Sequence, residues 1–312
     1  MTSASDVAHR LRLASETVRA LEVFDQCGVD AILMKGPVIE RWLYPAGQRR
    51  PYSDIDLLVG PDAFERARRA LGDAGWVQRH PGARRSEVAP HAIELFRAGA
   101  VVDLHDRVPG VAVSPSAAWS LWKTAVVPIE LAGRELSAFG PEAVLVVVAV
   151  NAARDGHPSL DLAMSLKLDV DVWMRAFRLG SALGAAGVMS AGLNLAPGGG
   201  EFLSRIGLEA PSPAGELLIA ETPLVAGVAR LFEPASMWER ARVLAREIVP
   251  TPDGLRYWRP GRTTTRRGMA AMYAYRPIYL LWHGPRAVAT VWSTRRASGT
   301  SRAESGRGSL NR

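Results

Sequence analysis

Asp54 and Asp56 are separated by one residue at the start of an apolar run, S-D-I-D-L-L-V over residues 53–59. Because successive side chains of a strand point to opposite faces, the two carboxylates share one face, and Ile55 and Leu57 point into the core. Two carboxylates this close repel each other unless a cation or a proton lies between them. The pattern predicts a clamp for Mg²⁺ or Mn²⁺, built from hard oxygen ligands on a rigid strand.

Asp103 supplies a third acid, within the apolar run V-V-D-L-H over residues 101–105. Burying a carboxylate in such a run is costly unless it is paired or bound to a metal. Three acids can hold two metal ions, which activate an attacking oxygen and stabilise a leaving pyrophosphate. His105 shares the strand face of Asp103, and the spacing leaves open whether it orients a metal ligand, moves a proton or bonds to the backbone.

The elements that position these acids follow from hydrophobic periodicity and from turn residues. We expect helices over residues 5–28, 38–44 and 61–74, and strands over residues 29–34, 55–59, 76–79, 93–97 and 101–105. A turn at Lys35-Gly36-Pro37 and a polar loop over residues 45–53 connect the first of them. Strands and helices that alternate in this way predict a small α/β or α+β sheet domain.

The pattern becomes helical from Ser116 onward. We expect helices over residues 141–154, 159–184, 185–196 and 213–247, with a flexible break at the three glycines 198–200. The chain ends in a segment rich in Ser, Gly, Thr and Arg, which predicts disorder over residues 296–312.

The net charge of +7 is unevenly spread along the chain. Residues 256–312 contain twelve arginines, no lysine and one acid, so this segment carries +11 and the rest of the chain −4. The basic segment leaves nucleic acid open as a partner. Tyr273, Tyr275, Arg276 and Tyr279 interleave aromatic and basic side chains as a base-stacking surface would, but they also fit a helix packed on the protein.

Composition narrows the class of protein. Apolar residues make up 48% and charged residues 22%, which is typical of a globular protein with a sizeable core. Cys27 is the single cysteine, so it forms neither an internal disulfide nor a cysteine zinc site, and it fits a reducing cytoplasm. No run reaches the roughly 18 apolar residues of a membrane helix, and the start lacks the apolar segment of a signal peptide. We therefore expect a cytoplasmic protein with no membrane partner.

Three motifs together resemble a known family. The runs L-M-K-G-P (33–37), R-R-P-Y-S-D-I-D-L-L-V (49–59) and V-V-D-L-H (101–105) are similar, in order and spacing, to the uncharacterised nucleotidyltransferase family of the polymerase-beta-like superfamily. The resemblance is good over residues 20–125 and looser as far as residue 195. It implies a minimal nucleotidyltransferase mixed sheet with flanking helices, followed by a mostly helical region.

The resemblance also implies roles for individual residues. Asp54, Asp56 and Asp103 would be the catalytic residues and the metal ligands, and the nucleotide would be bound by Lys35, Gly36, Arg50 and Ser53. Gly36 would lie in the phosphate loop, with Lys35 and Arg50 facing the triphosphate. The loop departs from the superfamily, which usually has Gly-Ser or Gly-Gly here, because Pro37 lacks a backbone N–H. The charge of Lys35 could replace that lost donor.

The expected activity is metal-dependent transfer of a nucleoside monophosphate from an NTP, with ATP as the expected donor, to a hydroxyl or phosphate acceptor. The acceptor would be a small molecule, a peptide or a protein, and pyrophosphate would be released. We expect a catalytic domain over residues 1–115, a helical acceptor-binding domain over 116–250 and a basic segment over 251–312. Two alternatives remain: a toxin-like enzyme that modifies RNA or tRNA, and a non-catalytic nucleotide-binding module of the same fold.

Overall fold

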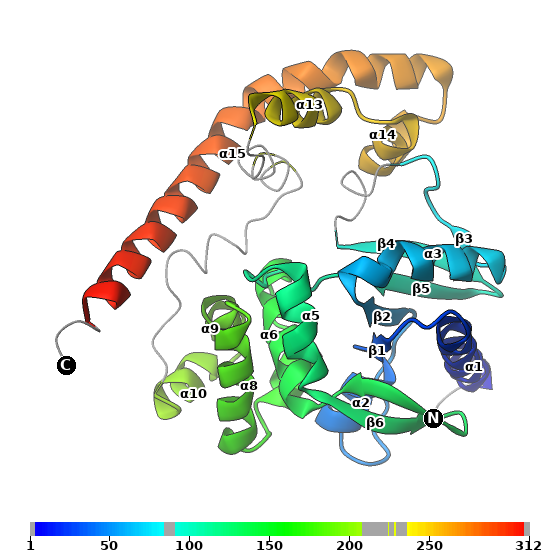
Figure 1. The fold of residues 1–312 in the computed structure, drawn as a ribbon, viewed down its shortest axis with the longest axis vertical. Coiled ribbons are helices and arrows are strands. Elements are labelled where there is room, and N and C mark those ends of the chain that lie inside the picture. The colour runs from blue at the N-terminus through cyan, green and yellow to red at the C-terminus, as the bar shows by residue number, and fades with distance from the viewer. Residues whose placement is uncertain (1–3, 84–90, 208–223, 225–227, 229–235, 309–312) are drawn as a thin grey trace. The chain divides into compact units, whose positions relative to one another are not determined.

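The computed structural model describes residues 4–83, 91–207, 224, 228 and 236–308 (Figure 1). Its contacts divide the chain into two compact units. The sheet unit comprises Met1–Arg79, His91–Ala153 and His157–Ala210. The C-terminal unit comprises His80–Pro90, Arg154–Gly156 and Pro211–Arg312.

The sheet unit begins with alternating helices and strands, in nearly the order that the sequence predicts. They are α1 (Ala4–Gln26), β1 (Ala31–Leu33), α2 (Pro37–Leu43), β2 (Ile55–Val59), the 3₁₀ turn η1 (Pro61–Ala63), α3 (Phe64–Asp73), β3 (Val77–Gln78), β4 (Ala92–Arg97) and β5 (Ala100–His105). Pro37 and Pro61 both occupy first-turn positions, where a missing N–H costs nothing. The expected helices and strands of this half are therefore confirmed, with ends shifted by a few residues.

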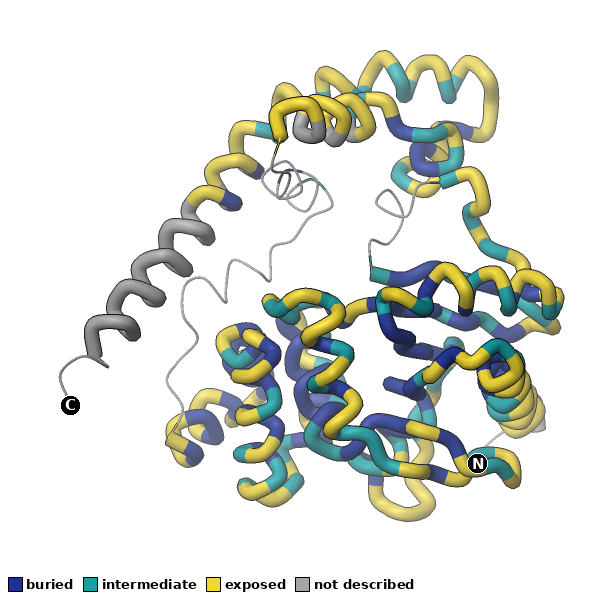
Figure 2. Tube along the Cα trace, in the orientation of Figure 1, coloured by how far each residue is buried: buried dark blue, intermediate teal, exposed yellow. Residues whose placement is uncertain are grey.

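All the strands that the structure describes, including the later β6 (Val126–Leu131) and β7 (Arg134–Phe139), form one mixed, seven-stranded sheet in the order β3-β4-β5-β2-β1-β7-β6. The pairs β2–β5 and β1–β7 are parallel, and the remaining pairs are antiparallel. Strand β2 lies at the centre, and every one of its residues is buried (Figure 2). Acids on this strand are therefore held in the interior of the domain.

Residues 126–139 correct the sequence analysis, which predicted only helices after Ser116. After α5 (Pro115–Lys123), the chain forms a hairpin of β6 (Val126–Leu131) and β7 (Arg134–Phe139). The hairpin turns through Ala132 and Gly133, both with positive φ, as a two-residue turn of this kind requires. Strand β7 then pairs with β1, so the domain boundary expected at residue 115 cuts through one sheet.

A group of helices follows the sheet: α6 (Pro141–Asp155), α7 (Leu160–Ser165), α8 (Val170–Ala182), α9 (Ala186–Asn194) and α10 (Gly199–Arg205). Helix α6 is buried over Ala143–Val150, which explains its continuous apolar run. Helix α9 packs closely against α6 at Gly192. A Cβ added to Gly192 would lie only 1.9 Å from the Ala149 carbonyl oxygen. The helix expected over 159–184 is two helices, and the part of the expected helix 213–247 before residue 236 lies almost wholly outside the described residues.

The C-terminal unit contains α13 (Met237–Ile248), α14 (Pro252–Trp258), the 3₁₀ turn η2 (Pro260–Arg262) and α15 (Arg266–Gly308). Helix α15 continues through residues 296–308, where the composition predicted disorder. Extending a helix that already exists avoids the cost of nucleation, so weak helix formers can be carried along. No helix in the described part of the chain is long and apolar enough to cross a membrane.

Candidate active site

Strands β2 and β5 bring two acids side by side. The strands are parallel, and their register places Asp56 directly opposite Asp103. On the other side of β5, the register with β4 places Glu94 opposite Asp103. Three carboxylates therefore stand in a row across three neighbouring strands.

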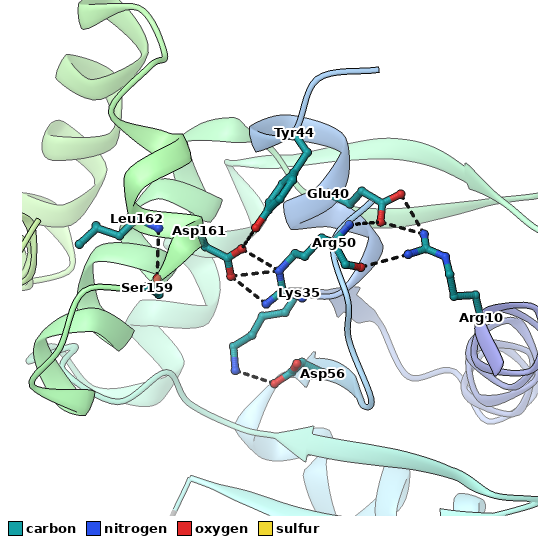
Figure 3. Close-up of polar contacts among 9 residues, drawn as sticks. All are labelled: Arg10, Lys35, Glu40, Tyr44, Arg50, Asp56, Ser159, Asp161 and Leu162. Atoms are coloured by element: carbon teal, nitrogen blue, oxygen red, sulfur yellow. Dashed lines mark hydrogen bonds and ion pairs between the residues drawn. The ribbon is translucent and has the colours of Figure 1, made fainter. Parts of the chain in front are cut away.

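Asp56 is almost fully buried, and its Oδ1 atom has two partners. The Lys35 ammonium donates to it at 2.7 Å (Figure 3), and His105 Nε2 lies 3.2 Å from it. Burial would raise the pKa of Asp56, but the Lys35 charge and the hydrogen bond with His105 hold that pKa below its ordinary value. Asp56 is therefore a carboxylate at neutral pH, with a cation already beside it.

Asp103 is less well compensated. Burial raises the pKa of its carboxyl to about 7, and the charges of Asp56 and Asp54 contribute to the rise. Its Oδ1 atom is buried and has no hydrogen-bond partner among the residues that the structure describes. A buried oxygen of this kind is costly to leave alone. A divalent cation that binds hard oxygen ligands fits this position.

The residues that could hold such an ion are Asp56, Asp103 and His105. Each offers one donor atom, and these atoms all lie within 4.8 Å of one another. Asp54 comes directly before β2 and does not belong to this group of three. Burial and the nearby charge of Asp56 raise the pKa of Asp54. The structure thus places two of the three expected acids beside His105, and a ligand role stays a prediction for all three acids.

Lys35 reaches Asp56 from the turn between β1 and α2. The Met34 amide donates to the Asp56 carbonyl at 3.0 Å, which fixes this turn at the level of Asp56. Gly36 follows with φ of 60°, a conformation that favours glycine. A Cβ at Gly36 would lie 3.2 Å from the Tyr52 ring, so a larger residue would also require that ring to shift by a few tenths of an ångström.

Arg50 is bound to Asp161 of α7. Its Nε and Nη2 atoms donate to the two carboxylate oxygens at 2.9 and 2.8 Å (Figure 3). The Tyr44 hydroxyl donates to the same carboxylate at 2.7 Å. This two-pronged geometry is the strong form of an arginine–carboxylate pair. Two of the three guanidinium nitrogens are therefore used within the protein.

Glu40 fixes the loop that leads from Arg49 to Asp54. Its carboxylate accepts hydrogen bonds from Arg10 at 2.8 Å and from the Arg50 amide at 3.0 Å (Figure 3). It also accepts one from Arg49 at 3.1 Å. Burial opposes ionisation, but these donors hold the pKa of Glu40 below its ordinary value. The loop is thus clamped at Glu40 and again at Asp161.

Comparison with known proteins identifies the family. A family model described as "Uncharacterised nucleotidyltransferase" matches residues 3–183, which is more than half of the chain. The chain belongs to this uncharacterised nucleotidyltransferase family. A search of curated proteins finds no match.

Several solved structures are similar to part of the chain. The lincosamide antibiotic adenylyltransferase LnuA, in its lincomycin-bound form, is 18% identical, covers 42% of this chain and 83% of its own, and has a TM-score of 0.31. ANT(2")-Ia in complex with adenylyl-2"-tobramycin is 15% identical, covers 62% of this chain and 97% of its own, and has a TM-score of 0.35. An antigenic nucleotidyltransferase-like protein from Paracoccidioides brasiliensis is 14% identical, covers 68% and 97%, and has a TM-score of 0.35.

In this member of the family, the expected site residues are only partly assembled. Asp56, Asp103 and Lys35 lie together, Gly36 follows Lys35, and Ser53 is exposed next to Asp54. A triphosphate contact by Arg50 stays a prediction, since Asp161 holds much of its guanidinium.

The sequence analysis missed four residues around the site: Glu40, Tyr44, Glu94 and Asp161. Glu94 carried a signal, because it interrupts the apolar strand I-E-L at residues 93–95. The partners Arg50 and Asp161 are 111 residues apart, a separation that leaves no local pattern.

Proposed function

We propose that this protein is a metal-dependent nucleotidyltransferase that uses ATP, or another NTP, and a hydroxyl or phosphate acceptor. An acceptor oxygen would attack the α-phosphorus, the bond from that phosphorus to the bridging oxygen of the β-phosphate would break, and pyrophosphate would leave. The observation that carries the proposal is the facing pair of the buried Asp56 and the half-buried Asp103, whose Oδ1 atom is buried and has no hydrogen-bond partner among the described residues. A like-charged pair in the interior is costly, and catalytic sites commonly retain such a cost.

Asp56 and Asp103, with Asp54 beside them, would hold Mg²⁺ or Mn²⁺, which supplies positive charge to the triphosphate and to the attacking oxygen. Lys35 would bind the phosphates, because its ammonium already lies at the edge of the acid pair and its side chain is partly exposed. Gly36 would let the backbone approach the nucleotide closely. Ser53 and Arg50 would complete the nucleotide site.

The acceptor would bind beside the catalytic sheet, on the helical part of the sheet unit from α6 to α10. The alternative of an RNA acceptor rests on the aromatic and basic residues of α15, and the structure favours their use in packing. The Trp258 and Tyr279 rings pack edge-on, with their centroids 5.0 Å apart. The Arg276 guanidinium lies over the Trp258 ring, 4.6 Å from its centroid. Aromatic faces engaged by neighbours in the same unit are poorly suited to stacking on bases.

A screen for transferred nucleotide tests the proposal. Purified protein is incubated with cell extract, Mg²⁺ or Mn²⁺ and mass-tagged NTPs, and labelled products are compared between wild type and the Asp54→Ala/Asp56→Ala double variant. We expect labelled products that appear only with wild type. Circular dichroism spectra of the two proteins serve as the control for folding. Identical product patterns for the two folded proteins would contradict the proposal.

A further inference from the structure

We propose that His105 is a direct nitrogen ligand of the metal ion at Asp56 and Asp103, and that the site therefore prefers a divalent transition ion such as Mn²⁺ over Mg²⁺. The inference rests on the proposed function, because it concerns the same metal site. It goes beyond the all-carboxylate set Asp54, Asp56 and Asp103 that the sequence motifs imply.

The first argument is position. His105 follows Asp103 by two residues on β5, so both side chains lie on one face of the strand. The His105 side chain is 6% exposed, and its Nε2 atom is 3.2 Å from Asp56 Oδ1. Adjacent ligands at right angles around an ion, with bonds of about 2.1 Å, have their donor atoms about 3 Å apart. The two atoms are thus already spaced as neighbouring ligands of one ion.

The second argument is that Asp56, Asp103 and His105 form one compact set of donors. Their donor atoms lie within 4.8 Å of one another, and Asp103 contributes a buried oxygen with no hydrogen-bond partner in the described structure. Asp54 is outside this set, at the open end of the strand. The third donor atom close to Asp56 and Asp103 therefore belongs to the His105 imidazole.

The third argument concerns orientation. The His91 ring stacks on the His105 ring, with centroids 5.6 Å apart and planes inclined by 30°. This stacking restricts rotation of the buried His105 ring and keeps Nε2 toward Asp56. Lys35 pairs with the same Oδ1 atom of Asp56, and its longer, partly exposed side chain can withdraw toward the triphosphate when an ion binds.

The chemistry of the donors sets the choice of metal. Mg²⁺ takes oxygen ligands and holds water tightly, whereas divalent transition ions also accept an imidazole nitrogen. Binding requires a neutral ring with its proton on Nδ1 and a lone pair on Nε2. Replacing one oxygen ligand by His105 should lower the affinity for Mg²⁺ relative to Mn²⁺.

The rival role for His105 is a positioning one, in which Nε2 only donates a hydrogen bond to Asp56 and never touches the ion. Electron spin-echo spectroscopy of bound Mn²⁺ separates the two roles, because it detects a nitrogen nucleus bonded to the metal. The full-length protein is prepared with ¹⁵N-histidine and with unlabelled histidine, and spectra are recorded with Mn²⁺ and a non-hydrolysable triphosphate. Bound Mn²⁺ and Mg²⁺ are also titrated in His105→Gln and in the matched control His157→Gln, which changes an exposed histidine.

We expect a nitrogen coupling that changes with the histidine isotope in wild type and in His157→Gln and is lost in His105→Gln. We also expect His105→Gln to weaken Mn²⁺ binding by about 10-fold or more and to weaken Mg²⁺ binding less, since an imidazole nitrogen favours the transition ion. Bound Mn²⁺ without a histidine coupling in wild type would overturn this inference and leave the proposed function standing. No bound Mn²⁺ at all would overturn the inference together with the metal site of the proposed function. The wild-type spectrum decides the question even where a variant does not fold.

Discussion

Two of the acid pairs that face each other across neighbouring strands of the sheet differ in their surroundings. Asp56 and Asp103 are opposed on β2 and β5, and Glu130 and Glu135 are opposed on β6 and β7. Both glutamates are exposed, so water solvates their charges and the pair costs little. Asp56 is buried and Asp103 is half-buried, and the pKa of Asp103 is raised to about 7. The same pairing therefore has little energetic cost between β6 and β7, whereas between β2 and β5 it favours a bound cation.

The surrounding carboxylates support this interpretation. Glu40 and Asp161 are also largely shielded from water, but each accepts several hydrogen bonds from arginine. Asp103 has a buried oxygen without a hydrogen-bond partner in the described residues. Carboxylates with several hydrogen-bond donors stabilise the fold, whereas a shielded carboxylate without such donors indicates a candidate ligand-binding site.

The largest expected effect separates the two acid pairs by activity. Asp54→Asn, Asp56→Asn and Asp103→Asn should each lower the rate of nucleotide transfer by more than about 100-fold, because each removes a ligand charge and keeps the volume. Glu130→Gln should leave the rate unchanged. The measurement is initial rate at saturating Mg²⁺ or Mn²⁺, with the acceptor found by the product screen. Near wild-type turnover in any one aspartate variant would show that this residue is not a metal ligand.

Most of the catalytic half could be predicted from the sequence, because its signals are local. Alternation along S-D-I-D-L-L-V fixes which side chains share a face, and the observed strand has the predicted bounds, Ile55–Val59. The register that sets Asp56 opposite Asp103 is a tertiary feature that no local pattern specifies. The expectation that both acids hold a metal ion nevertheless implied that they lie close together. Ion pairs such as Arg50–Asp161 join distant segments and could not be anticipated in this way.

The missed hairpin shows how a local signal can be overlooked. The chain turns twice through Ala-Gly, at Ala98-Gly99 and at Ala132-Gly133, and all four residues have positive φ. The first turn lies between strands that the aspartate motif already marked. The second follows Val126-Val127-Pro128, where Pro128 weakened the strand pattern, although proline is tolerated on the edge strand that β6 proves to be.

A smaller effect should distinguish the lysines beside acids in the two settings. Lys35 donates to the buried Asp56, and Lys123 pairs with the exposed Asp30. Lys35→Ala should weaken triphosphate binding by about 1.5–3 kcal/mol, the range for a hydrogen bond to a charged group. Lys35→Arg should recover part of this loss, because the charge remains but the geometry differs. Lys123→Ala should have no effect on binding.

Titration calorimetry with a non-hydrolysable triphosphate and Mg²⁺ measures these affinities. Equal affinities for wild type and Lys35→Ala would remove the phosphate role and leave Lys35 as a structural partner of Asp56. In that case the Lys35 ammonium would still pair with Asp56, but it would not contact the bound nucleotide.

The smallest expected effect concerns stability without metal. Above pH 7 the Asp103 carboxyl is ionised next to Asp56, so Asp103→Asn removes a buried repulsion and should stabilise the metal-free protein by about 1 kcal/mol at pH 8, well within the Coulomb energy of such a pair. The folded wild type binds its proton more tightly than the unfolded chain, so its stability falls, relative to the variant, as pH rises from about 4 through 7. The gain of the variant should therefore shrink at pH 5. Glu130→Gln, which alters the exposed pair, should change stability by less than about 0.5 kcal/mol at either pH. Urea unfolding in the presence of a chelator measures the free energy of unfolding of wild type and of the two variants. If Asp103→Asn is less stable than wild type at pH 8, the Asp103 carboxylate is compensated by a partner within the fold.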